Sequence, residues 1–240
     1  MEREKLDRLA VLIDADNAQS SLAEPLFSEI ARYGDASVRR AYGDWTTQNL
    51  VGWKSELHRL AIQPVQQFRY TTGKNATDSA LIIDAMDLLH SSKFEGFCIV
   101  SSDSDFTRLA TRIREAGVRV FGFGEEKTPA PFVAACNKFI YTSILAPTVA
   151  REGELAPVTS KRPSLKPLLL AAIDAVAGDD GWAHLGALGS ILVKNDPSFD
   201  ERGYGHKKLS DLVRKQKYLE IREEKTANAP SAVLWVRARP

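Results

Sequence analysis

The segment Leu9-Ala10-Val11-Leu12-Ile13-Asp14-Ala15-Asp16-Asn17 decides the fold of this chain, because an unbroken apolar run passes directly into an acidic turn. An apolar run of this length is typical of a strand buried on both faces, as in a parallel sheet covered by helices. Similar runs alternate with helical patterns through the first 145 residues. We therefore predict a three-layer, doubly wound α/β domain with a parallel sheet. The predicted strands are Leu9–Ile13, Ser37–Tyr42, Ile62–Val65, Phe97–Val100 and Arg119–Phe123.

The helical segments divide the chain into two domains. Gln48–Leu60, Thr77–Ser91 and Asp105–Ala116 repeat apolar residues at spacings of three and four, and Gly117 is placed to end the last of them. Residues 146–162 are polar and interrupted by proline and glycine, which predicts a linker between domains 1–145 and 163–240. Three helices and two strands then predict a small winged helix. These elements are Leu165–Ala177, Trp182–Lys194, Lys207–Gln216, Tyr218–Ile221 and Val233–Val236.

The composition excludes several classes of protein. The chain has 240 residues, of which 44% are hydrophobic, and its net charge of +1 excludes a histone-like polycation. Its two cysteines, Cys98 and Cys136, lie in apolar stretches and are too few for a disulfide framework, so we expect buried thiols. Because no apolar run approaches the roughly 20 residues that span a bilayer, and the first residues do not form a signal peptide, we expect a cytoplasmic protein with no membrane partner.

Acidic residues leave the predicted strands where a ligand would bind. In an open parallel sheet, ligands lie outside the carboxyl ends of the strands, and Thr77 is a natural N-cap that would put Asp78 at the same edge. A single Asp at a strand end is commonly a helix cap, and Asp16 and Asp105 have that alternative role. The acidic residues expected at this edge are Asp14, Asp16, Asp78, Asp103 and Asp105.

Several carboxylates at one edge repel one another unless a cation neutralises them, and all-oxygen ligands suit Mg²⁺ or Mn²⁺. Such a cation can activate water and neutralise charge on a phosphodiester, so the pattern favours hydrolytic nuclease chemistry. The four histidines have no metal-ligand spacing. Asn17 is expected to orient a carboxylate or a phosphate, and Lys74 to contact a phosphate or to lie in solvent. Asp84 lies on a polar stripe of its helix and is expected to be exposed.

Four motifs in order resemble the NYN domain, the LabA-like branch of the PIN-like nucleases, over residues 6–145. They are Val11–Asn17, Lys74–Ala85, Ser101–Phe106 and Val120–Pro129. The resemblance implies a metal-dependent ribonuclease site carried by Asp14, Asp78 and Asp103, with Asp105 and Asp16 assisting. Ser102 stands where the family often has Gly. The segment from Gly122 through a helix reaching Phe139 is expected to be structural, although its glycines could also approach an RNA backbone.

The second domain is similar to the OST-HTH (LOTUS) domain in residues 163–238, through Gly181–Gly189, Pro197–Asp200, Lys208–Val213 and Leu234–Arg237. That family is associated with RNA, in some members G-rich and quadruplex-forming RNA, and some members instead bind a DEAD-box RNA helicase. A basic helix beside an aromatic loop suits phosphates and unpaired bases, although the lysines can equally be an ordinary solvated face. Trp182, Phe199 and Trp235 are expected in the core. The residues expected to contact RNA are Asn17, Lys74, Tyr204, Lys207, Lys208, Arg214 and Lys215.

Two other functions compete with the ribonuclease. A haloacid-dehalogenase-like phosphatase also has two acids after its first strand, but it usually carries Thr or Val two residues after the second acid, where this chain has Ala18. A catalytically inactive RNA-binding or adaptor protein would use the winged helix alone. Cleavage of RNA with and without Mn²⁺ separates these functions.

Overall fold

The computed structural model describes residues 6–68, 76–145, 163–224 and 233–239. The chain divides into two compact units, Met1–Ala150 and Arg151–Pro240, and each is described by itself. None of the helices in the described ranges is long and apolar enough to cross a membrane.

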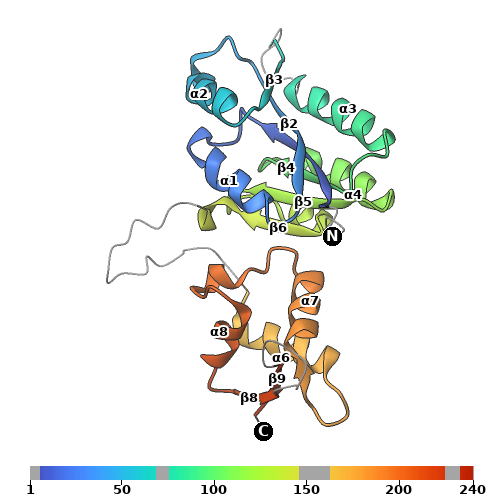
Figure 1. Ribbon diagram of the computed structural model, residues 1–240, viewed down its shortest axis with the longest axis vertical. Helices are drawn as coiled ribbons and strands as arrows, with labels where there is room; N and C mark the ends of the chain where they lie inside the picture. Colours follow the sequence, from blue (N-terminus) through green and yellow to red (C-terminus); the bar gives the residue numbers. More distant parts are fainter. Residues whose placement is uncertain (1–5, 69–75, 146–162, 225–232, 240) are drawn as a thin grey trace, which may run out of the picture. The chain divides into compact units, whose positions relative to one another are not determined.

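The first unit is built on a six-stranded, all-parallel sheet (Figure 1). The strand order is β3-β2-β1-β4-β5-β6, so the chain reverses its direction of winding between β1 and β4. This reversal is the point at which doubly wound sheets bind ligands at their carboxyl edge. The predicted fold class is confirmed. The strands are β1 (Arg8–Asp14), β2 (Asp35–Gly43), β3 (Gln63–Gln66), β4 (Gly96–Val100), β5 (Arg119–Gly124) and β6 (Lys138–Tyr141).

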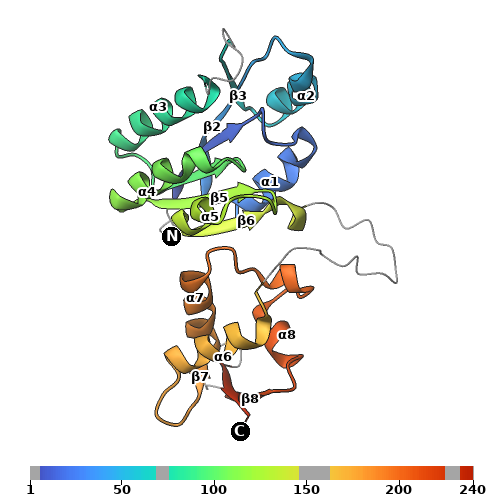
Figure 2. The ribbon, with the colours of Figure 1, turned by 180° about the vertical axis from the view of Figure 1, so that it is seen from behind.

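Helices cover both faces of the sheet, as Figures 1 and 2 show. α1 (Ala23–Ile30) and α2 (Val51–Arg59) pack on one face, against Leu9, Val11 and Ile13 of β1. The intervening side chains of β1 point to the other face, as the period of a strand requires. That face is covered by α3 (Ala76–His90), α4 (Thr107–Glu115) and α5 (Ala130–Ala135).

The sequence-based prediction was wrong for the end of this unit. It predicted a helix reaching Phe139, whereas α5 ends at Ala135 and β6 follows as the edge strand beside β5. Phe139 and Ile140 are fully buried on opposite faces of the sheet, which a strand achieves and a helix does not. It also missed α1, which is only eight residues long. Two predictions are confirmed: Gly117 ends α4 with a φ of +78°, and both cysteines are buried and free.

The second unit is a small domain with helices and an antiparallel sheet of order β7-β9-β8. Its core includes Leu169, Leu188, Leu212 and Val236. The helices are the predicted three, and two of them begin later than predicted. The elements are α6 (Leu165–Val176), β7 (Ala183–His184), α7 (Leu185–Asn195), α8 (Leu209–Arg214), β8 (Leu219–Glu224) and β9 (Val233–Ala238).

Two helices of the second unit begin later than predicted. α7 starts at Leu185 because Ala183–His184 pairs with β9 as a short strand. α8 starts at Leu209, so the lysines before it lie outside the helix.

Phe199 is buried, as expected, but Trp182 and Trp235 are only partly buried and do not form the core. The guanidinium carbons of Arg222 and Arg237 lie 4.9 and 4.7 Å from the ring centre of Trp182, so the arginines cover this side chain.

Candidate metal centre and active site

The acidic residues gather at the carboxyl edge of the sheet, beside the reversal between β1 and β4. Asp14 is the last residue of β1, and Asp103 follows β4 by three residues. Asp78 is in the first turn of α3. Because β1 and β4 are parallel neighbours with Ile13 opposite Val100, their acidic ends leave the sheet at the same level.

Asp14 is fully buried behind this edge. Its Oδ2 accepts hydrogen bonds from Asn17 Nδ2 at 2.6 Å and from Ser101 Oγ at 2.8 Å. Among the described residues, its Oδ1 has no hydrogen-bond partner. Burial raises the pKa of Asp14, and the bonds from Asn17 and Ser101 oppose that rise. Asn17, expected to orient a carboxylate or a phosphate, therefore lies with its amide on a carboxylate.

Three other carboxylates lie close enough to share one cation. Asp78, Asp103 and Asp105 each offer an oxygen, and these three oxygens lie within 4.8 Å of one another. Asp103 also caps the turn that follows, because its Oδ1 accepts a hydrogen bond from the Asp105 backbone N–H at 2.9 Å. Asp14, which the resemblance placed in the metal set, is not in this group of three, whereas Asp105, expected only to assist, is.

Asp78 is the member of this group whose pKa is raised most clearly by its surroundings. This partly buried carboxyl has its pKa raised from 3.8 to about 6, first by burial and then by repulsion from Asp14, Asp103, Asp105 and Asp16. The raised pKa means that, without a cation, the surroundings of Asp78 do not fully stabilise the negative charge of these carboxylates.

Two residues of α3, Thr77 and Asp84, hold the helix in place through hydrogen bonds. The helix begins at Ala76, one residue before the predicted cap, and the Thr77 hydroxyl donates to Asp16 Oδ2 at 3.1 Å. Asp84 was predicted to be exposed, and that prediction is wrong. It is partly buried and accepts hydrogen bonds from Arg40 Nη1 at 2.9 Å and Tyr42 Oη at 2.8 Å. Because both donors belong to β2, Asp84 fixes the middle of the helix whose first turn carries Asp78.

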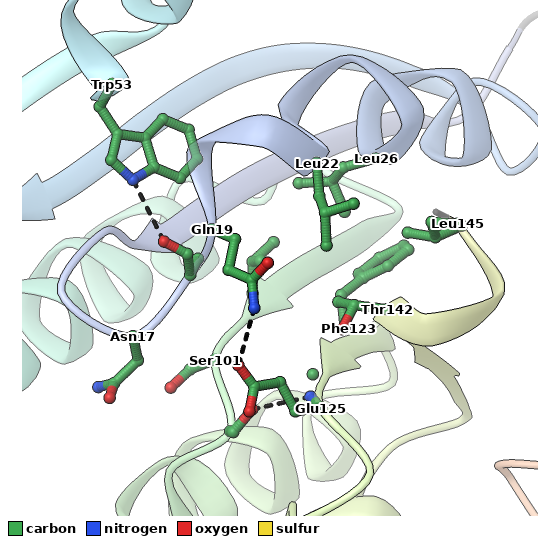
Figure 3. A pocket seen from close by; sticks show the side chains of 14 residues that line it. Asn17, Gln19, Leu22, Leu26, Trp53, Ser101, Phe123, Glu125, Thr142 and Leu145 are labelled. Atoms are coloured by element: carbon green, nitrogen blue, oxygen red, sulfur yellow. Dashed lines mark hydrogen bonds between the residues drawn. The ribbon is translucent and has the colours of Figure 1, made fainter. Parts of the chain in front are cut away.

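A narrow pocket is lined in part by Asn17 and Ser101, the two residues that donate hydrogen bonds to Asp14 (Figure 3). Apolar side chains such as Leu26 and Phe123 and further polar ones such as Gln19 and Glu125 complete its wall. Gln19 Nε2 donates to Glu125 Oε1 at 3.4 Å, as Figure 3 shows. The cavity is about 20 Å³, room for a water molecule and not for a nucleobase.

The glycines in the second half of β5 allow close packing against neighbouring segments of the protein. A Cβ on Gly122 would lie 2.4 Å from the ring of Phe139, and one on Gly124 would lie 2.7 Å from the Ser101 carbonyl oxygen. Both glycines are fully enclosed by the protein itself. The expectation that they could meet an RNA backbone is therefore wrong.

The predicted RNA-binding residues of the second unit occupy different surroundings. Lys207, Lys208 and Lys215 are exposed. Arg214 forms a 2.6 Å ion pair with Glu223. Tyr204 is partly buried, with its ring centre 5.9 Å from that of Phe199, so it packs on the core more than it faces solvent. Lys74 lies outside the described residues.

The fold and its acidic edge define an α/β domain of the PIN-like, nuclease-like class, followed by a small helical domain with an antiparallel sheet. The NYN domain family matches residues 8–145, and the OST-HTH/LOTUS domain matches residues 162–229. The chain therefore belongs to the NYN domain family and carries a C-terminal OST-HTH/LOTUS domain, a class associated with RNA binding. Both resemblances seen in the sequence are confirmed.

Several solved structures are similar to parts of the chain. A protein of unknown function from Vibrio parahaemolyticus is 17% identical, with a TM-score of 0.48, over 58% of this chain and 94% of that one. An uncharacterized protein from Nitrosomonas europaea is 32% identical, with a TM-score of 0.30, over 38% of this chain and 91% of that one. A Chromobacterium violaceum protein is 44% identical, with a TM-score of 0.27, over 32% of this chain and 83% of that one. No curated protein matches the chain.

Proposed function

We propose that this protein is a divalent-metal-dependent ribonuclease that hydrolyses RNA phosphodiester bonds at the carboxyl edge of its NYN domain, and that the winged helix binds the RNA. The observation that carries the proposal is the placement of carboxylate oxygens of Asp78, Asp103 and Asp105 within 4.8 Å of one another. The buried Asp14 stands behind them.

The residues of this edge fit a hard divalent cation. Mg²⁺ and Mn²⁺ prefer oxygen ligands, and all the candidate ligands are carboxylates. The raised pKa of Asp78 expresses repulsion that a cation would relieve. The Oδ1 of Asp14 is buried and has no hydrogen-bond partner among the described residues. A cation nearby would stabilise this oxygen. Asp16, held by Thr77, is placed to assist.

The protein side of the mechanism is orientation. Asp103 is fixed by its own helix cap and Asp78 by the position of α3, so their oxygens are held in place before RNA binds. A bound divalent cation would lower the pKa of water and neutralise charge on the phosphodiester. In the hydrolysis, a water oxygen bonds to phosphorus, one ester P–O bond breaks, and the leaving oxygen takes a proton. No Ser or Cys nucleophile is needed.

The winged helix supplies affinity through its exposed lysines. Among the residues described in the second unit, no carboxylate lies within ion-pair distance of Lys207, Lys208 or Lys215, so their charges are available to phosphates. Arg214 forms an ion pair with Glu223, and Tyr204 packs against the core. We therefore assign both residues a smaller contribution to RNA affinity.

The test is cleavage of labelled single-stranded RNA by the full chain with Mn²⁺, with Mg²⁺ or with EDTA. We expect cleavage only with a divalent cation and none by Asp103→Asn, while Asp87→Asn, which removes an exposed charge from α3, behaves like the wild type. Metal-independent cleavage, or full activity of Asp103→Asn, would contradict the proposed site. Release of phosphate from a small phosphomonoester instead of RNA cleavage would favour the phosphatase.

A further inference from the structure

A groove runs between α3 and α4 on the face of the sheet opposite α1 and α2. Figures 1 and 2 show these two helices side by side over that face. The groove has a volume of about 400 Å³, within the range of roughly 300–1,000 Å³ usual for small-molecule sites. Ile82 and Met86 line it from α3, and Arg108, Leu109 and Arg112 line it from α4.

The groove begins at the carboxylate group. Asp105 lines one part of it and is also one of the three carboxylates that lie within 4.8 Å of one another. From Asp105, α4 carries Arg108 and then Arg112 away from the site, four residues apart and thus on the same side of the helix. A chain with one phosphate at the carboxylates therefore meets these two arginines next.

The charge of the groove suits a polyanion. Arg108 is exposed, and in the described part of the chain no carboxylate lies within ion-pair distance of it. Arg112 has only Glu115, at 3.8 Å and with both side chains more than half exposed, a pair that contributes little. The other acid facing the groove is Asp105, which the proposed cation would neutralise.

The floor of the groove suits a base. Ile82 and Met86 are partly buried and packed against the core, and they give the groove an apolar surface on its α3 side. An unpaired base has an apolar face that can lie on such a surface while its phosphate contacts an arginine. Paired RNA cannot use the floor, because its bases are stacked within the duplex.

We propose that this groove binds the single-stranded RNA adjoining the cleaved phosphodiester, with phosphates on Arg108 and Arg112 and a base against Ile82 and Met86. The inference rests on the proposed ribonuclease function and extends it: the NYN domain selects single-stranded RNA by itself, through a track separate from the winged helix. Arg108 and Arg112 are positioning residues that hold the substrate and take no part in the bond-breaking step.

The test replaces both arginines in the full chain, Arg108→Gln with Arg112→Gln, and compares a dinucleotide with single-stranded RNA of roughly 12 nucleotides. We expect KM for the longer RNA to rise on the order of tenfold with kcat unchanged, while the dinucleotide is cleaved at the wild-type rate. Binding of the longer RNA in EDTA should lose about 0.7 from its salt slope for each missing phosphate contact. Lys93→Gln, which removes an exposed cation preceding β4 at the opposite edge, should change neither measurement.

A second measurement locates the RNA directly. RNA carrying a photoreactive uridine should crosslink to peptides of α3 or α4, and Met86→Glu should abolish that crosslink. Wild-type KM, salt slope and crosslinking in the double variant would overturn the groove. If the wild type cleaves no RNA with any metal, the proposed function fails, and the EDTA binding and crosslinking still decide whether the groove holds RNA.

Discussion

Asp78→Asn should stabilise the metal-free protein while abolishing its metal response. The pKa of Asp78 rises from 3.8 to about 6 on folding, roughly two units, and each unit corresponds to about 1.4 kcal/mol, so ionised Asp78 costs at most about 3 kcal/mol. Solvent reaches this partly buried group and reduces the figure. The negative charge also favours the first turn of α3, by about 0.5 kcal/mol. We expect a net gain of about 1–2 kcal/mol for the Asn variant at pH 7.5.

The gain has a defined pH window. A carboxyl whose folded pKa is raised destabilises the folded state fully above that pKa, and the cost decreases as the pH falls from about 6 and disappears below 3.8, where both states are protonated. The variant should therefore unfold about 2–8 °C above the wild type at pH 7.5 in EDTA, and only a small part of that difference should remain near pH 4, measured by calorimetry of the full chain. Saturating Mn²⁺ should raise the unfolding temperature of the wild type and leave that of the variant unchanged, because a ligand that binds only the native state stabilises it.

Asp87→Asn is the matched control, since Asp87 is an exposed carboxylate on the same helix. It should change the unfolding temperature little at either pH. An Asp78→Asn protein that is no more stable at pH 7.5, or equally more stable at pH 4, would refute the reasoning that repulsion and burial act on this carboxyl. A variant that still gains stability from Mn²⁺ as the wild type does would remove Asp78 from the metal ligands.

Three further outcomes are expected. Asp103→Asn should abolish cleavage of RNA in a gel assay while circular dichroism shows an intact fold, because the amide keeps the shape of the cap and loses the charge that holds a cation. Ser101→Ala removes a 2.8 Å hydrogen bond from a buried carboxylate, so it should lower the free energy of unfolding by about 1–3 kcal/mol in urea titrations and weaken Mn²⁺ binding. Charge reversal at Lys207, Lys208 and Lys215 together should weaken RNA binding and flatten its salt dependence in fluorescence anisotropy, with cleavage of a dinucleotide unchanged; unaltered affinity and slope would instead make the winged helix a protein-binding module.

The sheet could be predicted from the sequence because its signal is local. β1, β4 and β5 are apolar runs buried on both faces, and these strands and β2 each fall within two residues of the predicted bounds at both ends. β6 was missed because its four residues follow a short helix without a turn signal, and only their pairing with β5 identifies them. In the second unit, α7 was predicted too early because the strand pairing of Ala183–His184 is likewise a tertiary fact.

The candidate site was predictable as a set of residues and not as a geometry. That Asp14, Asp78 and Asp103 approach one edge follows from the strand ends and a helix start. Which oxygens lie within reach of one cation depends on side-chain directions, and these bring Asp105 into the group while Asp14 turns inward to Asn17 and Ser101. A sequence pattern cannot distinguish these arrangements, because both are compatible with acids at adjacent strand ends.

The contacts of Asp84 explain why the prediction that the polar stripe of α3 faces solvent was wrong for this residue. Helical periodicity counts a charged residue as solvent-facing, yet Arg40 and Tyr42 of β2 reach it, and Tyr42 is itself fully buried. Burial and the neighbouring Asp84 carboxylate together raise the pKa of Tyr42, so its hydroxyl remains a donor at physiological pH. Together with the contact from Thr77 to Asp16, this bond ties α3 to both β2 and the turn after β1. Because α3 carries one of the three clustered carboxylates, its hydrogen bonds to β2 and to the turn after β1 help to determine whether that group is complete.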